Sequence, residues 1–214
     1  MVTRLRKRVG SLIILRKFIY LISPNKINKK FYGTLSKVLS SGNVKFFQLR
    51  MKKYKKDKIL EISKQVKKIT NKFKVKFILN DDYNLSIMSK TDGCHIGQND
   101  GSIKDARKKL KQKILGVTCH NSKLLVMNAL KYKADYVALG SFYKSKLKPQ
   151  AKKSNFKTLK WAKQNIKKPI VAIGGINNLN YKKLIKFGAK YIALSSYIWD
   201  NKKLKPEIAI KKFK

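Results

Sequence analysis

Two aspartates, Asp81 and Asp100, are the residues of this 214-residue chain whose type and placement most clearly indicate chemistry. Acidic residues are scarce, with 10 against 53 basic ones, yet each of these two follows an apolar run of strand length. Carboxylates at the ends of neighbouring strands suit Mg²⁺, which takes one or two carboxylates together with substrate phosphates. The alternative is that both aspartates only cap the helices that follow them. We favour the metal site, because capping alone does not explain the repeated placement.

The elements that must position these aspartates alternate between β-branched apolar runs and segments with helical periodicity. Strands are predicted at residues 18–23, 44–49, 75–80, 93–96, 113–118, 135–140, 169–174 and 191–195. Helices are predicted at residues 31–41, 56–72, 83–90, 103–111, 122–132, 156–166, 178–187 and 203–212. Eight regular units predict an α/β protein with a parallel sheet, and favour a single (β/α)8 TIM barrel over an open doubly wound sheet. The barrel is expected to span residues 18–214, after a short basic N-terminal extension (1–17) that we expect to be helical.

Active sites of such barrels form where the strands end and the following loops begin. The second strand ends with Gln48 and Arg50, and a guanidinium placed there can hold a pyrophosphate through paired hydrogen bonds. Lys52 follows and, taken alone, reads as a solvated charge. His95 lies within a strand and is interpreted as a structural hydrogen-bonding residue, whereas His120 is expected at the rim, where it could contact a ligand.

A second anion pocket is predicted after the last two strands, around Gly174-Gly175 and Ser195-Ser196. Barrels often bind phosphate with these two loops, and helix N-termini bind it through free N–H groups. The alternative is a pair of tight-turn glycines and two small serines at the edge of the core. One divalent cation with two anion pockets suits departure of pyrophosphate, with a second phosphorylated substrate as the nucleophile.

The formal net charge of +43 raises the hypothesis of nucleic-acid binding. The lysines are spread over every predicted helix, and no zinc finger or arginine-rich arm accompanies them, so no specific nucleic-acid partner is expected. No apolar run reaches the roughly 18 residues of a membrane-spanning helix, so no membrane partner is expected either. Cys94 and Cys119 cannot form a disulfide framework, which favours a reducing, cytoplasmic location.

Several short strings, in order and with suitable spacing between residues 18 and 198, resemble the thiamine-phosphate synthase family. They are YLIS (20–23), QLRMK (48–52), ILND (78–81), GCHIGQND (93–100), GVTCHN (116–121), ADY (134–136), AIGGI (172–176) and GA (188–189). In that family the enzyme joins hydroxymethylpyrimidine diphosphate to a thiazole phosphate, which yields thiamine phosphate and pyrophosphate. The resemblance therefore implies a Mg²⁺-dependent transferase whose partners are small phosphorylated molecules.

The resemblance also implies a role for each matching residue. The pyrimidine diphosphate pocket would be formed by Gln48, Arg50, Lys52, Asn80 and Thr118, the last in place of a family serine. Asp81 and Asp100 would hold Mg²⁺ on the diphosphate. The thiazole phosphate would be received by Gly175, Ser195 and Ser196, together with Ser145 and Lys148 of the strand-six loop. The residues implied in catalysis are Arg50, Lys52, Thr118 and Lys148.

The chain departs from the family pattern at positions that bear on this site. Asp82 stands where the family usually has arginine. The strand-six loop, residues 141–148, keeps a hydroxyl at Ser145 but has Leu147 in place of a second one. This loss weakens the expected hold on the thiazole phosphate.

Two other functions compete with the synthase. A thiazole tautomerase of the same superfamily is an isomerase that needs no Mg²⁺ and uses a histidine near the position of His120. The presence of Arg50, Asn80, Asp81 and Asp100 favours the synthase, because a tautomerase has no diphosphate to bind. The more remote alternative is a basic, non-enzymatic, nucleic-acid-associated protein, and whether the chain forms a homo-oligomer is left open.

Overall fold

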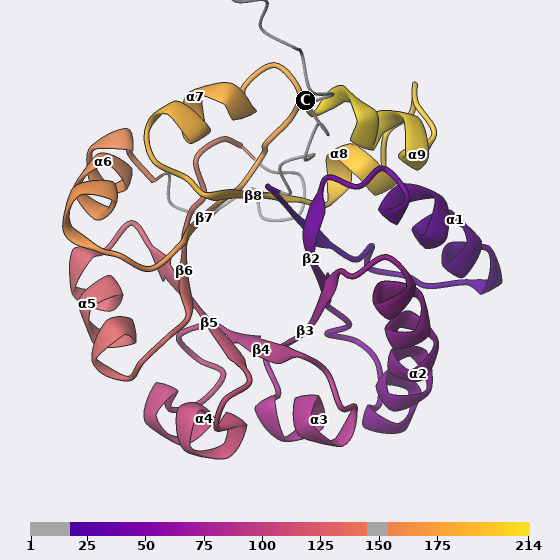
Figure 1. Ribbon diagram of the computed structural model, residues 1–214, viewed down its shortest axis with the longest axis horizontal. Coiled ribbons are helices and arrows are strands. Elements are labelled where there is room, and N and C mark those ends of the chain that lie inside the picture. The colour runs from indigo at the N-terminus through magenta and orange to yellow at the C-terminus, as the bar shows by residue number, and fades with distance from the viewer. Residues whose placement is uncertain (1–17, 145–153) are drawn as a thin grey trace, which may run out of the picture.

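The structure is a computed structural model that describes residues 18–144 and 154–214. Within these residues eight parallel strands close into one barrel in chain order (Figure 1). They are β1 (Ile19–Ile22), β2 (Val44–Leu49), β3 (Lys76–Asn80), β4 (Gly93–Ile96), β5 (Ile114–His120), β6 (Tyr136–Gly140), β7 (Ile170–Ile173) and β8 (Tyr191–Leu194). The closed barrel confirms the predicted TIM barrel, and the open doubly wound sheet is wrong.

Helices surround the barrel as an outer ring (Figure 1). They are α1 (Lys29–Leu39), α2 (Lys56–Lys72), α3 (Tyr83–Met88), α4 (Ile103–Leu110), α5 (Lys123–Lys131), α6 (Phe156–Asn165), α7 (Tyr181–Lys186), α8 (Ser196–Trp199) and α9 (Pro206–Ala209). The last predicted helix is shorter than expected, since α9 passes directly into the 3₁₀ turn η1 (Ile210–Lys212). The four-residue helix α8 was not predicted, because so short a segment shows no periodicity.

Two layers of apolar side chains fill the fold because successive strand residues point to opposite faces. In β1, Tyr20 and Ile22 belong to the layer inside the barrel, whereas Ile19 and Leu21 belong to the layer under the helices. The inner layer is small and rich in aromatic rings, and it also contains Phe46, Ile78, Tyr136, Ala138, Val171, Tyr191 and Ala193. The barrel interior is therefore a packed core, and ligands are expected only at its ends.

Short polar side chains begin several of the helices by accepting a backbone N–H. Asp82 is one of them, since its Oδ1 accepts the amide of Leu85 at 2.8 Å at the start of α3. Similar caps are made by Asn28, Ser102, Ser122 and Asn155. The capping role considered for the acidic stretch thus belongs to Asp82, and the neighbouring Asp81 side chain makes other contacts.

Aspartates at the amino end of the barrel tie neighbouring strands together. The strands follow one another clockwise in Figure 1, and because such crossovers are right-handed, the view is onto this amino end. Asp92 accepts the amide of Phe77 at 2.8 Å and pairs with Lys76 at 3.4 Å. Asp135 accepts the amide of Leu115 at 2.8 Å and pairs with Arg107 at 2.6 Å.

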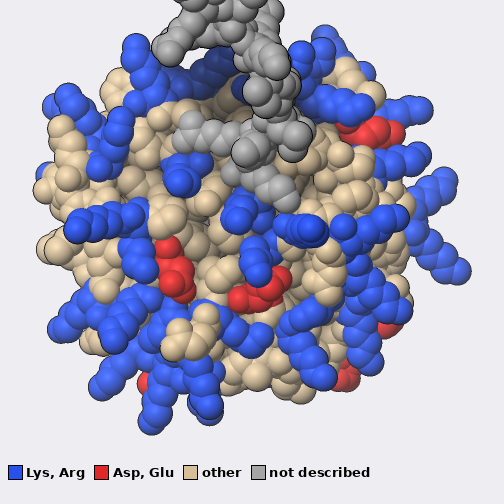
Figure 2. All heavy atoms as spheres, in the orientation of Figure 1, with Lys and Arg blue, Asp and Glu red and all other residues tan. Residues whose placement is uncertain are grey.

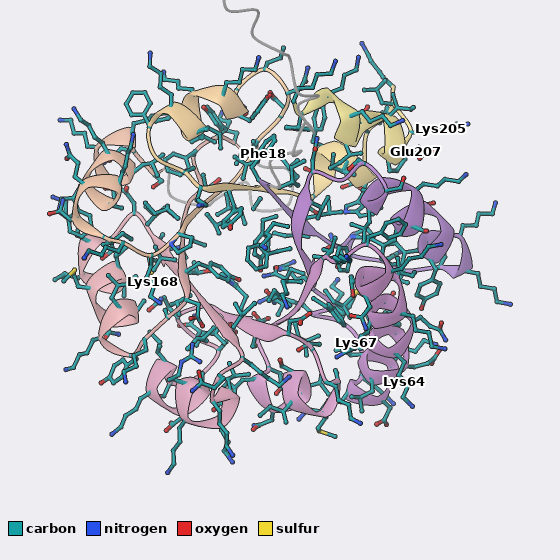
Figure 3. The ribbon with its side chains drawn as sticks, in the orientation of Figure 1. Phe18, Lys64, Lys67, Lys168, Lys205 and Glu207 are labelled. Carbon is teal, nitrogen blue, oxygen red and sulfur yellow. The ribbon has the colours of Figure 1, made fainter. Side chains whose placement is uncertain are left out.

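Many basic side chains and a few acids are spread over this amino end, with other residues between them (Figure 2). Lys168, labelled in Figure 3 at the start of β7, reaches Asp135 with its Nζ 3.9 Å from Oδ1. The predicted helical extension, residues 1–17, lies outside the described residues. Among the described residues, none of the helices has both the length and the apolar character needed to cross a membrane.

Candidate active site

The carboxyl groups of Asp81 and Asp100 lie together at the carboxyl ends of β3 and β4, close enough for each to shift the pKa of the other. The amide of Asp81 donates to the carbonyl oxygen of His95 at 2.7 Å, which places the residue directly beside β4. Asp100 turns back over its own loop, so that the Gly97 amide donates to Oδ2 at 2.7 Å. Asp81 has a φ of 69°, in the left-handed region that aspartate adopts more readily than most residues. The structure thus brings the two predicted metal ligands together.

The two carboxyl groups differ in how firmly they hold a proton. Burial raises the pKa of Asp81, and the hydrogen bond shared with Asp100 raises it further. Burial also acts to raise the pKa of Asp100, but the hydrogen bonds with Asp81 and the Gly97 amide outweigh it and lower that pKa overall. Two neighbouring carboxylates repel each other, so a nearby cation is needed for both Asp81 and Asp100 to ionise.

Lys52 provides one such cation, because its Nζ lies 3.2 Å from Oδ2 of Asp81. The lysine side chain is half exposed, so the pair is in contact with solvent and contributes little to stability. Lys52 was interpreted from the sequence alone as a solvated charge, and the structure instead places it on the acid pair. An ammonium group held here is well situated to move onto an anionic ligand.

The donor set of this site fits Mg²⁺. Among residues 18–144 and 154–214 no group of three or more His, Cys, Asp or Glu side chains could hold a metal by itself. Mg²⁺ does not require such a group, since it usually keeps waters and takes one or two carboxylates plus the phosphates of its substrate. Asp81 and Asp100 are two carboxylates of this kind, on neighbouring strand ends.

Arg50 and Asn80 lie at the same level of the barrel, next to this acid pair. The register of β2 and β3 pairs Leu49 with Leu79, so Arg50 and Asn80 follow on neighbouring strands. The Arg50 amide is held by Oγ of Ser23 at 3.0 Å, while no hydrogen bond or ion pair joins its guanidinium to another described residue. A cavity of about 200 Å³ is lined in part by Lys52, Asn80 and Asp81, whereas Arg50 and Asp100 are not among its lining residues.

Gln48 and Thr118, both predicted to bind substrate, are joined through the barrel interior by three further side chains. Nε2 of Gln48 donates to the Tyr20 hydroxyl at 3.0 Å, and that hydroxyl lies 2.7 Å from the Tyr136 hydroxyl. The Tyr136 hydroxyl lies 3.0 Å from Nδ1 of His95, whose Nε2 lies 2.8 Å from Oγ1 of Thr118. We call these five residues the interior relay. The prediction that His95 is a structural hydrogen-bonding residue is confirmed.

The amino-acid pattern did not single out the two tyrosines of the interior relay. Tyr20 and Tyr136 lie in short apolar strand runs, where a tyrosine reads as one more core residue. The signal that could have found them is the alternation of side chains along a strand, which places Tyr20 on the same inward face as Ile22. A tyrosine that points into the barrel needs a partner for its hydroxyl. Burial raises the pKa of both hydroxyls well above the ordinary value, so both keep their protons at neutral pH.

The glycines after β7 are accounted for by the packing of two loops. Gly174 and Gly175 have φ of 106° and 59°, values that favour glycine. A Cβ on Gly174 would overlap the Ser141 side chain, and one on Gly175 would overlap the carbonyl oxygen of Lys144. This is the tight-turn alternative, and a contact between Gly175 and phosphate stays a prediction.

Ser195 and Ser196 lie where β8 passes into α8. Oγ of Ser195 donates to the carbonyl oxygen of Ser23 at 3.2 Å, and Ser196 is the first residue of the short helix. Phosphate sites of barrels commonly use the N-terminus of a short extra helix at this place. Ser145 and Lys148, the other residues predicted for this pocket, lie outside the described residues. His120 is exposed at the end of β5, as expected for a rim residue.

The carboxyl end of the barrel thus presents the acid pair with Lys52 and Arg50. Gln48 and Thr118 are the polar residues there that were predicted to bind substrate.

Known proteins are similar to this chain in fold and in sequence. Residues 19–198 match the family model described as Thiamine monophosphate synthase. Among solved structures, the fold is similar to that of thiamine phosphate pyrophosphorylase from Pyrococcus furiosus, with a TM-score of 0.82 and 24% identity. That match covers 94% of this chain and 95% of the other, and it shows the fold alone.

Similarity in sequence goes further. The chain is 52% identical over 200 residues to the thiamine-phosphate synthase of Pelagibacter ubique, a match covering 93% of this chain and 97% of that protein. It is 38% identical over 186 residues to the thiamine-phosphate synthase of Erythrobacter litoralis, covering 85% and 87% of the two chains. The chain therefore belongs to the thiamine monophosphate synthase family.

Proposed function

We propose that this protein is a thiamine-phosphate synthase, which joins hydroxymethylpyrimidine diphosphate to a thiazole phosphate and releases pyrophosphate. The observation that carries the proposal is the acid pair of Asp81 and Asp100, with Lys52 on it and Arg50 at the neighbouring strand end. Acids and cations assembled at one opening suit a metal-bound diphosphate, and two relatives with 52% and 38% identity carry this name.

In this proposal the diphosphate lies over the ends of β2, β3 and β4. Asp81 and Asp100 would hold Mg²⁺, which supplies positive charge to the departing diphosphate oxygens. Arg50 holds the diphosphate through its guanidinium, and Lys52 moves from its ion pair with Asp81 to a phosphate oxygen. Asn80, beside Arg50 in the register, completes the pocket.

The reaction breaks one bond and forms another. The bond between the methylene carbon of the pyrimidine and the diphosphate oxygen breaks, and its electron pair leaves with pyrophosphate. The carbon becomes cationic, and the lone pair of the thiazole nitrogen then forms the new carbon–nitrogen bond. Gln48 and Thr118 orient the pyrimidine ring so that the cationic carbon faces the thiazole.

The thiazole phosphate is assigned to the other side of the same opening. Ser195 and Ser196 lie after β8 and the Gly175 loop after β7, where barrels of this class bind phosphate. Ser145 and Lys148 of the strand-six loop are expected to close this pocket. Because Leu147 replaces a hydroxyl there, we expect weaker binding of the thiazole phosphate than of the pyrimidine diphosphate.

An assay with both substrates, with and without Mg²⁺, tests the proposal and separates it from the tautomerase. The expected result is release of pyrophosphate that depends on Mg²⁺ and on both substrates. Isomerisation of the thiazole without metal, and without release of pyrophosphate, would support the tautomerase instead. Asp105→Asn is the matched control, since Asp105 is an exposed acid on α4 and should release pyrophosphate at the wild-type rate.

The charge distribution weighs against nucleic-acid binding as the main role. Figure 2 shows basic side chains scattered over the visible part of the amino end rather than gathered in one stripe. Such a surface binds polyanions by releasing counterions, so the binding falls steeply with salt. Retention of arbitrary RNA near physiological salt would favour the nucleic-acid alternative, and its loss there is the expected result.

A further inference from the structure

Four of the five residues of the interior relay are nearly inaccessible to water, so the protons between Gln48 and His95 must be placed within the relay itself. Gln48 is 3% exposed, Tyr20 and Tyr136 are 2% exposed, and His95 is 9% exposed. Each buried donor is expected to have an acceptor, because one left without a partner destabilises the folded state. The barrel interior is otherwise packed with apolar side chains, and among the described residues the two tyrosine hydroxyls have no acceptors besides each other and Nδ1 of His95. The arrangement of protons can therefore be worked out by counting.

Counting begins at Gln48, whose Nε2 can only donate, so the Tyr20 hydroxyl accepts from it. The Tyr20 proton then has Tyr136 as its remaining partner and is donated there. Tyr136 accepts that bond and donates its own proton to Nδ1 of His95. An accepting Nδ1 carries no proton, so the neutral ring carries its proton on Nε2 and donates it to Oγ1 of Thr118.

The two ends of the interior relay thus acquire opposite characters. At one end the Gln48 amide nitrogen is used, which leaves the carbonyl oxygen Oε1 to accept. At the other end Oγ1 of Thr118 accepts from His95, which leaves the hydroxyl proton to be donated. Thr118 is only partly buried and Gln98 also donates to its carbonyl oxygen, so the residue lies beside the loop that carries Asp100.

We propose that Tyr20, Tyr136 and His95 are positioning residues that set Gln48 as a hydrogen-bond acceptor and Thr118 as a hydrogen-bond donor toward the substrate ring. The inference rests on the proposed function, in which these two ends bind the pyrimidine. The ring that fits presents an amino group to Gln48 and an unprotonated ring nitrogen to Thr118. If the ring carried a carbonyl group in place of the amino group, its oxygen would face Oε1 of Gln48. Two acceptors would then face each other, and such a ring is rejected.

The proton arrangement can be measured without any activity. The chain has two histidines, so the ¹⁵N resonances of the His95 ring are assigned by comparison with the variant His120→Gln. The wild type is expected to carry the proton on Nε2 with a hydrogen-bonded, unprotonated Nδ1. Tyr136→Phe should shift the Nδ1 resonance toward that of an imidazole nitrogen without a hydrogen bond. A proton on Nδ1 in the wild type would overturn the proposal.

Tyr191→Phe is the matched control. Tyr191 also points into the barrel and packs edge-on against Phe46, with ring centroids 5.1 Å apart, but it makes none of the contacts of the interior relay. Its substitution removes a tyrosine hydroxyl from the same core layer. It should leave the His95 resonances in place, and a shift equal to that of Tyr136→Phe would mean that the spectra report only general loosening of the core.

Kinetics test the consequence for specificity. Tyr20→Phe and Tyr136→Phe should each raise the KM for the pyrimidine diphosphate by about tenfold, as expected for loss of a buried hydrogen bond. Preference for the amino ring over its carbonyl analogue should fall by about the same factor, and the KM for the thiazole phosphate should change less than about twofold. Equal losses for both substrates, or unchanged ring preference, would overturn the proposal.

Failure of the proposed function can be told apart from failure of this inference. If the wild type releases no pyrophosphate, the synthase assignment is lost, and with it the ring preference. The ¹⁵N spectra of His95 still decide whether the interior relay has the proton order derived above. If the wild type is active but Tyr136→Phe matches Tyr191→Phe in both measurements, the function stands and the positioning role is wrong.

Discussion

At the amino end of the barrel, Asp92 and Asp135 each meet a basic side chain and a backbone amide of a neighbouring strand. At the carboxyl end, Asp81 and Asp100 lie against each other, and burial raises the pKa of Asp81. The aspartates of the amino end are therefore paired with cations and amides. At the carboxyl end, Asp81 instead lies beside another acid, and its pKa is raised. In barrels of this class the amino end serves stability and the carboxyl end serves chemistry.

Residue type by itself does not distinguish these two uses of aspartate. Asp81, Asp92 and Asp100 lie within 20 residues of one another, and each stands beside a strand. What separates them is whether the residue precedes or follows its strand, because all strands of the barrel point the same way. The following predictions test this division of labour between the two ends.

The largest effect is expected from Asp81→Asn. Removal of one metal-binding carboxylate should lower turnover by more than about tenfold, because the diphosphate loses its charge stabilisation. The folded state should be at least as stable as that of the wild type, since no negative charge is then held partly buried beside Asp100. Turnover and thermal unfolding are measured on the same sample, and near-normal turnover would remove the metal assignment.

Asp135→Asn is the reciprocal variant at the other end. It weakens the contact with Arg107, whose Nη2 lies 2.6 Å from the carboxylate, and leaves partly buried charge on the arginine. We expect unfolding in urea to show a loss of about 1–3 kcal/mol. Turnover per folded molecule should match the wild type. A tenfold loss of turnover without loss of stability would contradict the division between the two ends.

Gly175→Ala sharpens the comparison, because it should destabilise the protein from the carboxyl end. The added Cβ would overlap the Lys144 carbonyl oxygen, at a residue whose φ is 59°. A loss of about 1–2 kcal/mol is expected from the left-handed backbone alone. Gly33→Ala is the control, since space is open around Gly33 and the helix should tolerate alanine. If Gly175→Ala were as stable as Gly33→Ala, the loops after β6 and β7 would have to move apart at little cost.

The smallest effect concerns pH. The pKa of Asp81 is raised by folding, so its contribution to stability is complete below its unfolded pKa and is lost as pH rises through the folded pKa. The pKa of Asp100 is lowered, so its contribution is present above its unfolded pKa and is lost as pH falls through the folded one.

Asp81→Asn, measured without divalent cations, should therefore gain stability over the wild type near about pH 7, and this gain should shrink toward about pH 4. Urea unfolding at several pH values measures the difference. An advantage of the variant that grows as pH falls would mean that the sign assigned to Asp81 is wrong.

Much of the fold could be predicted because its elements are short, regular and separately readable. The predicted bounds of the second and fourth strands agree with β2 and β4, residue for residue. The acid pair could be predicted as well, since strand ends of a parallel barrel meet at one opening. The contact of Lys52 with Asp81 could not, because a lysine among so many others carries no signal of its partner.

The sequence by itself determined the alternation of strands and helices, the polar residues at strand ends, and the family pattern. These depend on local periodicity and on residues next to one another in the chain. Only the tertiary structure decided that Lys52 lies against Asp81 and that Gly175 serves loop packing. It alone also joined Gln48 to Thr118 through Tyr20, Tyr136 and His95. Contacts across a closed barrel depend on the register of the strands and on the direction of each side chain. Residues that are neighbours in sequence determine neither of these.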